Sequence, residues 1–320
     1  MRRALLAAIG LAAVAVGGGC RQGEVPADPA KSALIAEIAA DAERVRDLFA
    51  DDAFVQRFLD AASTLKPRAT RRVLVDDVER DFDEADYYVA RWGTPVAYAR
   101  ILDIAAKAGA TTDEHARWLD FGFGAPGHLQ MLSRAGLDVV GVDVDPVGEA
   151  LYSLPEDAIA PPGSISLVYG RWPGTVVTKA KIASGYDAIV SKNVLKRGYI
   201  HPAREADPKH LIDLGVDDVT FLRELHSALK PGGIMVIWNL CPAQSAPGER
   251  YIPWADGQSP FSRGDWEAAG FEVLAFDVDD TAFARKMAYA LRFDAPDAPD
   301  GQGWDLEHDL RAWYTTVRRR

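Results

Sequence analysis

The stretch Asp120-Phe121-Gly122-Phe123-Gly124-Ala125-Pro126-Gly127 has the spacing D-x-G-x-G-x-x-G. The apolar run that leads into it, residues 118–121, is typical of a buried strand, and the apolar residues within 129–135 have helical spacing. Glycine allows the tight turn from strand to helix and lets the backbone approach a ligand closely. The stretch therefore predicts a ligand-binding loop between a strand and a helix.

On both sides of this loop, short β-branched runs alternate with helical stretches. This alternation indicates β-α-β units and a parallel sheet. The predicted strands are Trp118–Phe121, Val139–Asp143, Ile165–Val168, Ala188–Ser191, Ile234–Trp238, Phe271–Phe276 and Trp313–Val317. A predicted helix, Phe221–Leu229, ends at the turn Lys230-Pro231-Gly232-Gly233.

A carboxylate stands at the end of the second predicted strand. Asp143 lies sixteen residues after Gly127, where it could accept hydrogen bonds from both hydroxyls of an adenosine ribose. A strand that binds a nicotinamide cofactor usually runs apolar up to its first glycine, whereas Asp120 stands two residues before Gly122. A simple tight turn without a ligand is the alternative interpretation of the glycines.

The stretch from Asp120 to Gly127 resembles motif I of the class I S-adenosylmethionine-dependent methyltransferases. Gly141-Val142-Asp143 resembles the end of their second strand, residues 186–191 resemble their fourth strand, and residues 230–233 resemble the turn before their fifth. These segments span roughly residues 118–276 in the family's order. The resemblance implies an α/β fold with a Rossmann-like, doubly wound sheet, mostly parallel with an antiparallel last strand.

The resemblance also implies roles for single residues toward S-adenosyl-L-methionine. Gly122, Gly124 and Gly127 would border its methionine and ribose portions. Asp120 would lie near its amino group, and Asp143 would hold the ribose. Many family members carry an acid after the third strand that holds the adenine amino group, whereas this sequence has Gly170-Arg171-Trp172. Trp172 is the candidate for stacking on the adenine.

The loop after the fourth predicted strand should line the acceptor site, because ligands of open α/β sheets bind outside the carboxyl ends of the strands. It gathers cations in an otherwise acidic chain and could fix an anionic substrate. Its candidate substrate-binding residues are Lys192, Asn193, Lys196, Arg197 and Tyr199. His201 is a candidate general base, since its ordinary pKa lies near neutrality. Pairing of these cations with nearby acids, in a solvated helix start, is the alternative.

The loop after the fifth predicted strand, residues 239–261, is long and rich in proline. Irregular loops of this length in compact domains are usually functional lids or disordered, and its aromatic residues favour an ordered lid. Trp254 is a candidate for substrate contact, and Tyr251 and Asp256 are candidates for substrate contact and catalysis; all three could instead be packing residues. Cys241 is expected to be a buried thiol.

Residues 30–109 have the pattern of helices. Apolar residues recur with helical spacing within 34–49 and 54–62, and a third helix is predicted from near Pro95 to Gly109, because proline suits a first turn. We therefore expect a helical cap over residues 21–110 and a catalytic domain over residues 111–320.

Residues 1–20 resemble a bacterial lipoprotein signal peptide. Two arginines precede an apolar run, residues 4–16, and Gly17-Gly18-Gly19 leads into Cys20. The run has the length of a signal segment and is shorter than the roughly 20 residues of a membrane-spanning helix. The expected location is the cell envelope, with a lipid anchor at Cys20. An ordinary signal peptide, or a cytoplasmic protein with a mis-assigned start, are the alternatives.

The composition restricts the partners. There are 36 Lys and Arg against 47 Asp and Glu, a formal charge of -11. Nonspecific binding to nucleic acid needs clustered cations, so nucleic acid is not an expected partner. Membrane contact is expected only through the anchor at Cys20. The six histidines show no metal-binding spacing, and no metal site is predicted.

The sequence therefore predicts an S-adenosylmethionine-dependent methyltransferase with an unidentified small-molecule or protein acceptor. The cofactor is made in the cytosol, whereas the predicted signal directs the chain elsewhere. An exported, non-enzymatic binding module that kept the fold is therefore the second hypothesis. A nicotinamide-dependent reductase is the third, and Asp120 and the turn at 230–233 speak against it. The oligomeric state is left open.

Overall fold

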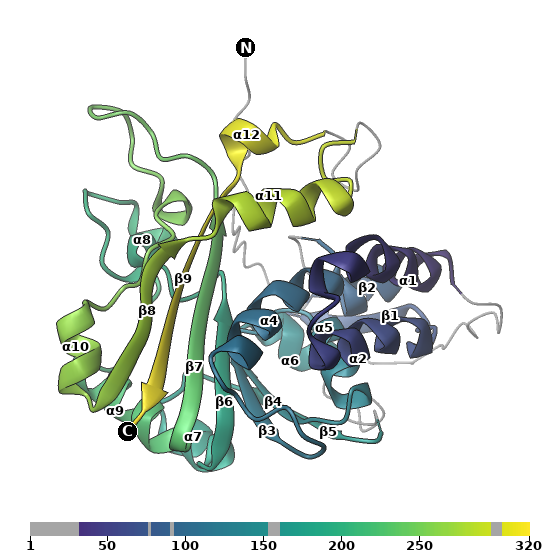
Figure 1. Ribbon diagram of the computed structural model, residues 1–320, viewed down its shortest axis with the longest axis horizontal. Helices are drawn as coiled ribbons and strands as arrows, with labels where there is room; N and C mark the ends of the chain where they lie inside the picture. Colours follow the sequence, from purple (N-terminus) through teal and green to yellow (C-terminus); the bar gives the residue numbers. More distant parts are fainter. Residues whose placement is uncertain (1–31, 76–77, 90–92, 153–160, 296–302) are drawn as a thin grey trace.

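A seven-stranded sheet with helices on both faces forms the centre of the molecule (Figure 1). The computed structural model describes residues 32–75, 78–89, 93–152, 161–295 and 303–320. The strands of this sheet are β3 (Arg117–Phe121), β4 (Asp138–Asp143), β5 (Ser164–Tyr169), β6 (Tyr186–Lys192), β7 (Leu229–Cys241), β8 (Phe271–Asp279) and β9 (Arg311–Arg319). Their order across the sheet is β5-β4-β3-β6-β7-β9-β8.

Helices and short 3-10 turns connect and cover these strands. The helices are α1 (Ala33–Val45), α2 (Ala53–Ala61), α3 (Glu84–Tyr88), α4 (Ala99–Lys107), α5 (Gly127–Arg134), α6 (Pro146–Tyr152), α7 (Val176–Ile182), α8 (Arg197–Ile200), α9 (Asp218–Ala228), α10 (Arg263–Ala268), α11 (Thr281–Ala290) and α12 (Leu306–Asp309). The 3-10 turns are η1 (Arg46–Phe49), η2 (Ala62–Thr64), η3 (Pro95–Tyr98), η5 (Pro208–His210) and η6 (Pro253–Ala255).

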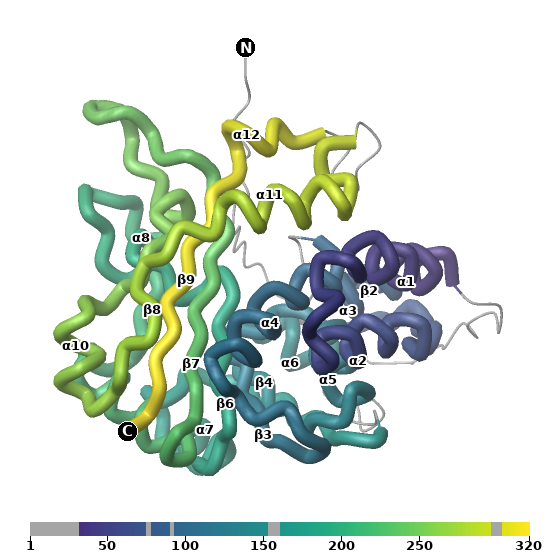
Figure 2. Tube along the Cα trace, viewed as in Figure 1, coloured from purple at the N-terminus to yellow at the C-terminus, as the bar shows by residue number. Residues whose placement is uncertain are grey.

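The direction of the strands confirms the predicted fold. From β5 to β7 all neighbouring strands are parallel, and β9 runs antiparallel between β7 and β8. Figure 2 shows the yellow C-terminal strand β9 inserted between these two green strands. This is the expected Rossmann-like, doubly wound sheet, mostly parallel with an antiparallel last strand.

Two features differ from the prediction. An antiparallel hairpin of β1 (Arg71–Val75) and β2 (Val78–Phe82) lies in the expected helical cap, where the apolar run 73–75 is too short to predict as strand or helix. Strand β7 begins at Leu229, so residues 230–233 lie in its irregular first part, where the register to β6 shifts. Gly232 has φ of +80° there, a backbone conformation that glycine adopts without strain.

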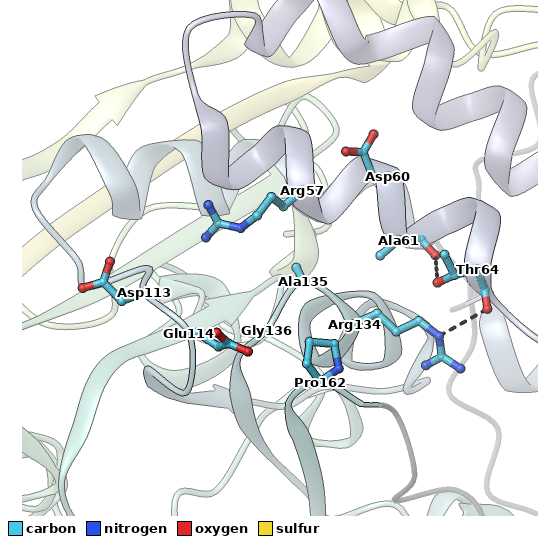
Figure 3. Close-up of a pocket in the computed structure, with 10 residues that line it drawn as sticks. All are labelled: Arg57, Asp60, Ala61, Thr64, Asp113, Glu114, Arg134, Ala135, Gly136 and Pro162. Atoms are coloured by element: carbon cyan, nitrogen blue, oxygen red, sulfur yellow. Dashed lines mark hydrogen bonds between the residues drawn. The ribbon is translucent and has the colours of Figure 1, made fainter.

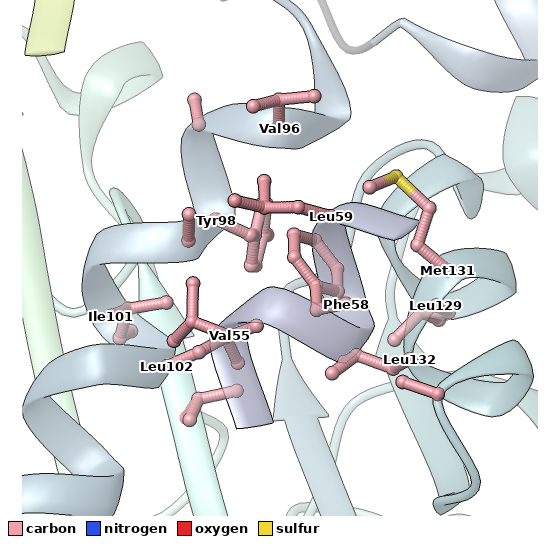
Figure 4. Packing of buried hydrophobic residues seen from close by; sticks show 14 of the residues in the cluster. Val55, Phe58, Leu59, Val96, Tyr98, Ile101, Leu102, Leu129, Met131 and Leu132 are labelled. Carbon is pink, nitrogen blue, oxygen red and sulfur yellow. The ribbon is translucent and has the colours of Figure 1, made fainter. Parts of the chain in front are cut away.

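The N-terminal helices pack into the same core as the sheet. One cluster of buried side chains joins α1, α2 and α4 to α5 and to one face of β3, β6 and β7. Figure 4 shows part of it, with Phe58 of α2 toward Leu129 and Leu132 of α5. Val55 of α2 lies beside Leu102 of α4 in the same view. A second cluster on the other face joins the sheet to α7, α9 and α10. The predicted helical cap is thus bound to the sheet by a continuous apolar interface.

Candidate cofactor and acceptor sites

The glycine-rich loop turns sharply from β3 to α5. Gly122 and Gly124 have φ of +80° and +62°, which side chains rarely adopt. The Gly122 amide donates to the Val142 carbonyl oxygen at 2.8 Å, so the loop is held against β4. A Cβ atom on Gly124 would have no other heavy atom within 4 Å. The backbone at Gly124 therefore faces open space.

Gly127 is required for a different reason, because its lack of a side chain lets α5 pack closely against the end of α3. A Cβ atom on Gly127 would lie 2.2 Å from the Tyr88 carbonyl oxygen. Gly141 on β4 is equally enclosed, since its Cβ would lie 2.6 Å from Phe123 and 2.7 Å from Leu129. These two glycines are required by packing.

Asp143 ties the glycine-rich loop to the end of β4. Its Oδ2 accepts from the Gly124 amide at 2.9 Å, and its Oδ1 accepts from the amides of Val144 at 2.7 Å and Asp145 at 3.0 Å. Burial raises the pKa of Asp143, and the three amides oppose that shift. A carboxylate has about four acceptor positions, so one on Oδ2 stays free. The geometry therefore leaves room for one ribose hydroxyl rather than the two that were expected.

Asp120 lies in a buried polar cluster at the end of β3. Its Oδ2 is 2.5 Å from Nε2 of His128, the second residue of α5. The imidazole of His128 stacks on Tyr98 of η3, with ring centroids 3.5 Å apart and planes 7° from parallel. Burial lowers the pKa of His128 although Asp120 opposes this shift. Within the described residues, Asp120 Oδ1 is buried and accepts no hydrogen bond.

His128 and Tyr98 were not among the predicted site residues. His128 follows Gly127 directly, so its position in the first turn after the loop was the available signal. Tyr98 comes from the N-terminal helical region, and its contact with the site depends on tertiary packing. Burial first, and the charge of Asp120 second, raise the pKa of Tyr98 well above its ordinary value.

Lys192 ends β6 beside this cluster. It is 9% exposed, and its Nζ lies 5.1 Å from the ring centre of Tyr98 and 6.0 Å from that of Trp238. Burial, and then the charge of Lys196, lower the pKa of Lys192 to about 8. The structure thus places one predicted acceptor-site cation next to the candidate cofactor site.

The predicted adenine-stacking residue lies in the core. Trp172 is 3% exposed and packs between Phe121 and Phe221, with ring centroids 6.1 Å and 6.2 Å away. Little of its ring surface is free for an adenine. By contrast, the side chain of Val144, directly after Asp143, is apolar and 65% exposed.

Two of the predicted substrate-binding residues hold the loop after β6 in place. Asn193 has φ of +66° and accepts from the Leu240 amide through Oδ1 at 2.7 Å. The Nζ of Lys196 donates to the carbonyl oxygens of Leu240 at 2.6 Å and Trp254 at 3.2 Å. Burial lowers the pKa of Lys196 to about 8. Tyr199 packs beside Lys196, and burial raises the pKa of Tyr199 to about 12.

Arg197, Tyr251 and Asp256 bind one another. Arg197 forms a two-pronged ion pair with Asp256, with both N to O distances at 2.9 Å. The Tyr251 hydroxyl donates to Asp256 Oδ2 at 2.6 Å. Burial, and then Asp256, raise the pKa of Tyr251 to about 12. The structure brings these predicted residues together as a link between the two loops.

The other two predicted residues lie apart from this link. Trp254 packs edge-on against His210, with ring centroids 5.2 Å apart. His201 is exposed, and its Nε2 is 2.8 Å from Asp218 Oδ2 at the start of α9. His201 is therefore engaged at the surface with an acid that could orient it.

Two hollows in the described part of the chain bear on the predicted sites. The larger, about 570 Å³, is lined by Arg57, Asp113, Glu114 and Arg134 among others (Figure 3). It lies at the amino ends of β3 and β4, the edge opposite to the glycine-rich loop. The smaller, about 400 Å³, lies at the carboxyl end of β7, between that strand, the lid and the start of β9. Only the smaller one is at the edge where such sheets bind ligands.

Other predictions concern membranes, metals and thiols. None of the helices in the described ranges has the length and apolar character needed to cross a membrane. Within the same ranges, His, Cys, Asp and Glu side chains form no group of three or more suited to a metal ion. Cys241 is a free, buried thiol, as expected. Residues 1–20 with Cys20 lie outside the described residues, so the lipid anchor stays a prediction.

Comparisons with known proteins give structural likenesses only. No protein-family model matches the sequence, and no curated protein matches it either. A methyltransferase from Thiobacillus denitrificans, solved with S-adenosylhomocysteine, is 15% identical over 74% of this chain and 96% of its own, with a TM-score of 0.42. One from Geobacter sulfurreducens, with the same ligand, is 16% identical over 69% and 90%, with a TM-score of 0.39.

A third likeness is to a protein of a different activity. The cyclase SpnF is 19% identical over 88% of this chain and 96% of its own, with a TM-score of 0.42. These likenesses do not distinguish one reaction from another. The order and direction of the strands define the fold independently of them.

Proposed function

We propose that this chain is an S-adenosylmethionine-dependent methyltransferase. The observation that carries the proposal is the hydrogen bond between the glycine-rich loop and Asp143. Asp143 Oδ2 accepts from the Gly124 amide at 2.9 Å and keeps one acceptor position free. This contact lies at the carboxyl edge of the sheet, where the strand order reverses between β3 and β6. That edge is the ligand-binding position of open α/β sheets.

The residues present fit the cofactor at three points. The buried Asp120 Oδ1 accepts no hydrogen bond among the described residues, although the Tyr98 hydroxyl interacts with the same carboxyl group. Oδ1 would accept the amino group of the methionine portion. The open space at Gly124 admits a ligand where a side chain would stand. The exposed Val144 offers an apolar surface beside Asp143 on which an adenine could lie. Val144 thus takes the place proposed for Trp172.

Bound S-adenosylmethionine would supply a methyl group on a sulfonium that is already activated for displacement. The protein must then mainly align an acceptor nucleophile with that methyl and exclude water. The loops after β6 and β7 stand at the right edge of the sheet to do this, and the Arg197, Asp256 and Tyr251 link holds them together. We propose a small molecule or a protein segment as acceptor.

The roles of single catalytic residues belong to the same proposal. A base is needed only for an acceptor that must lose a proton. His201, oriented by Asp218, is the most accessible candidate base of the two loops. Tyr251 and Asp256 are hydrogen-bonded to each other and to Arg197, which supports a role in positioning rather than in proton transfer.

Binding of S-adenosylhomocysteine to single-site variants tests the proposal. Asp143→Ala removes a charged acceptor whose hydrogen bonds are worth about 1.5–3 kcal/mol, so its affinity should fall by about ten- to a hundredfold. Asp145→Ala is the matched control, because the Asp145 side chain only accepts from the Val147 amide at 2.9 Å. Equal affinity of a folded Asp143→Ala protein and the wild type in calorimetry would refute the ribose role.

A further inference from the structure

The smaller hollow has an electrostatic character that the chain as a whole lacks. Its lining includes three arginines, Arg197, Arg204 and Arg311, and one carboxylate, Asp256. The whole chain carries a formal charge of -11. A local excess of positive charge in an acidic protein indicates a surface that attracts anions.

The three arginines are not equivalent. The guanidinium of Arg197 is neutralised by its two-pronged pair with Asp256. Arg204 and Arg311 form no ion pair with a carboxylate within the described ranges, and their hydrogen bonds there go to uncharged oxygens. Arg204 donates to the loop at 245–249, and Arg311 donates through Nη1 to the carbonyl oxygens of Glu307 and Leu310. Neither guanidinium is therefore neutralised by a close ion pair there, although Asp279 lies near enough for the charge of Arg311 to help lower the pKa of Asp279.

Apart from Gln244 and Gln258, the rest of the lining is uncharged and mostly apolar or aromatic. Tyr251 and Trp313 contribute rings, and Pro242 and Ala255 contribute aliphatic surface. The volume of about 400 Å³ is in the range of pockets for small organic ligands. A ligand that satisfies this lining combines an acidic group with an apolar, preferably planar, body.

The pocket lies on the same edge of the sheet as the glycine-rich loop. Cys241 ends β7, and it pairs with Arg311, the first residue of the antiparallel β9. From β3 to β7 there are two strand spacings, about 10 Å in total. A ligand anchored in the pocket could therefore extend toward the candidate cofactor site.

We propose that this pocket binds an organic anion, a carboxylate or a phosphomonoester on an apolar body, and that Arg204 and Arg311 hold its acidic group. The sequence pointed to an anionic substrate at Lys192, Lys196 and Arg197; the structure moves that role to two other cations. The further step, that this anion is the acidic end of the methyl acceptor, rests on the proposed function.

The test uses benzoate and phenyl phosphate as anionic probes and benzamide as their neutral counterpart. The full chain is labelled with 5-fluorotryptophan, and the Trp313 resonance is assigned with Trp313→Phe. Both anions, or one of them, should shift this resonance and bind at least about tenfold more tightly than benzamide, as expected for one charge-assisted hydrogen bond. Tighter binding of phenyl phosphate would identify the phosphate class, and tighter binding of benzoate the carboxylate class.

Arg311 is the residue to change, because Nη1 alone makes its hydrogen bonds in the described structure. Arg311→Gln should weaken anion binding at least about tenfold, and Arg311→Lys should restore part of it. Arg72→Gln is the control, since Arg72 forms an exposed pair with Asp81 on the β1–β2 hairpin. Equal binding of anions and benzamide to the wild type would overturn the proposal whether or not the variants fold.

S-adenosylhomocysteine is titrated in parallel on the same sample. Anion binding at Trp313 without S-adenosylhomocysteine binding would support the anion-binding pocket and refute the proposed function. S-adenosylhomocysteine binding with no effect of either anion on the Trp313 resonance would support the proposed function and refute anion binding in the pocket.

Discussion

At the scale of single residues, the glycines around the loop are required for different reasons, and substitution separates them. Gly127→Ala would place a Cβ atom 2.2 Å from a backbone oxygen, which neither neighbour can relieve by rotating a side chain. Such overpacking should lower the free energy of unfolding by about 1–3 kcal/mol or more. Urea denaturation of the variant and the wild type measures this loss.

Gly264→Ala in α10 is the matched control. The nearest atom to its added Cβ is 3.7 Å away, and alanine favours a helix by about 0.5–1 kcal/mol over glycine. The same substitution should therefore destabilise at Gly127 and leave stability unchanged or higher at Gly264. Equal effects at the two positions would contradict the close approach of α3 and α5.

Lys196 gives a prediction about pH. It is 4% exposed, and its pKa is about 8 in the folded chain against 10.5 ordinarily. Between these values the unfolded chain binds more protons, so the free energy of unfolding should rise with pH. Lys196→Met should remove up to about 1.4 kcal/mol per pH unit of this rise. Urea denaturation at several pH values between about 8 and 9.5, within the range between the two pKa values, measures how the free energy of unfolding changes with pH.

The exposed Lys181 supplies the control for this experiment. Lys181→Met should leave the pH slope of the wild type unchanged. Lys192, whose pKa is also about 8, contributes its own part of the wild-type slope. A slope in Lys196→Met as steep as that of the wild type would therefore show that the Lys196 ammonium is well solvated in the folded chain.

At this scale the sequence predicted well what depends on local spacing. Asp120, Gly122, Gly124 and Asp143 stand where their spacing placed them, because the loop joins adjacent strands. The contacts of His128 with Asp120 and Tyr98 join three separate segments, and no local pattern encodes them. Arg204 and Arg311 line the smaller hollow from segments far apart in the sequence, so no local pattern places them together.

At the scale of elements, the buried network around Arg100 joins α4, β7 and α11. Arg100 binds Asp103 at 2.5 Å and Asp280 at 2.6 Å, and the Trp238 indole donates to Asp280 at 2.9 Å. Arg100→Met would leave the buried Asp280 without its cation and the buried Asp103 with Lys107 alone. Removing one partner of a buried pair costs about 3–5 kcal/mol, which urea denaturation should detect.

Arg72→Met is the control for Arg100→Met. The pair of Arg72 with Asp81 is exposed on both sides, so Arg72→Met should leave stability close to that of the wild type. A similar small loss for Arg100→Met would mean that the buried network does not hold the three elements together.

Elements with strong apolar patterns were predicted, and polar ones were missed. The central strands β3, β4, β6 and β7 were found because most of their residues are buried on both faces. The β1–β2 hairpin was missed because β2 reads Val-Glu-Arg-Asp-Phe and its strand is mostly exposed. The extra residues of β7, up to Cys241, are set by pairing with β9, which lies far away in the sequence.

At the scale of the whole molecule, the N-terminal helices and the sheet share one core. Phe54 of α2 packs on Trp118 of β3 with ring centroids 5.4 Å apart, and Tyr98 reaches the candidate cofactor site. The helical region therefore completes the site as well as the core. The sequence predicted its helices but could not show how they are placed on the sheet.

The most direct measurement of the central claim is a calorimetric titration of the 320-residue chain with S-adenosylhomocysteine, beside reduced nicotinamide adenine dinucleotide. We expect S-adenosylhomocysteine to bind saturably at one site and the dinucleotide not to bind. At a hundredfold excess over Kd, S-adenosylhomocysteine should also add about 2.7 kcal/mol of stability and raise Tm by a few degrees. A folded protein that gives no heat and no Tm shift with S-adenosylhomocysteine, or that binds the dinucleotide instead, would contradict the central claim.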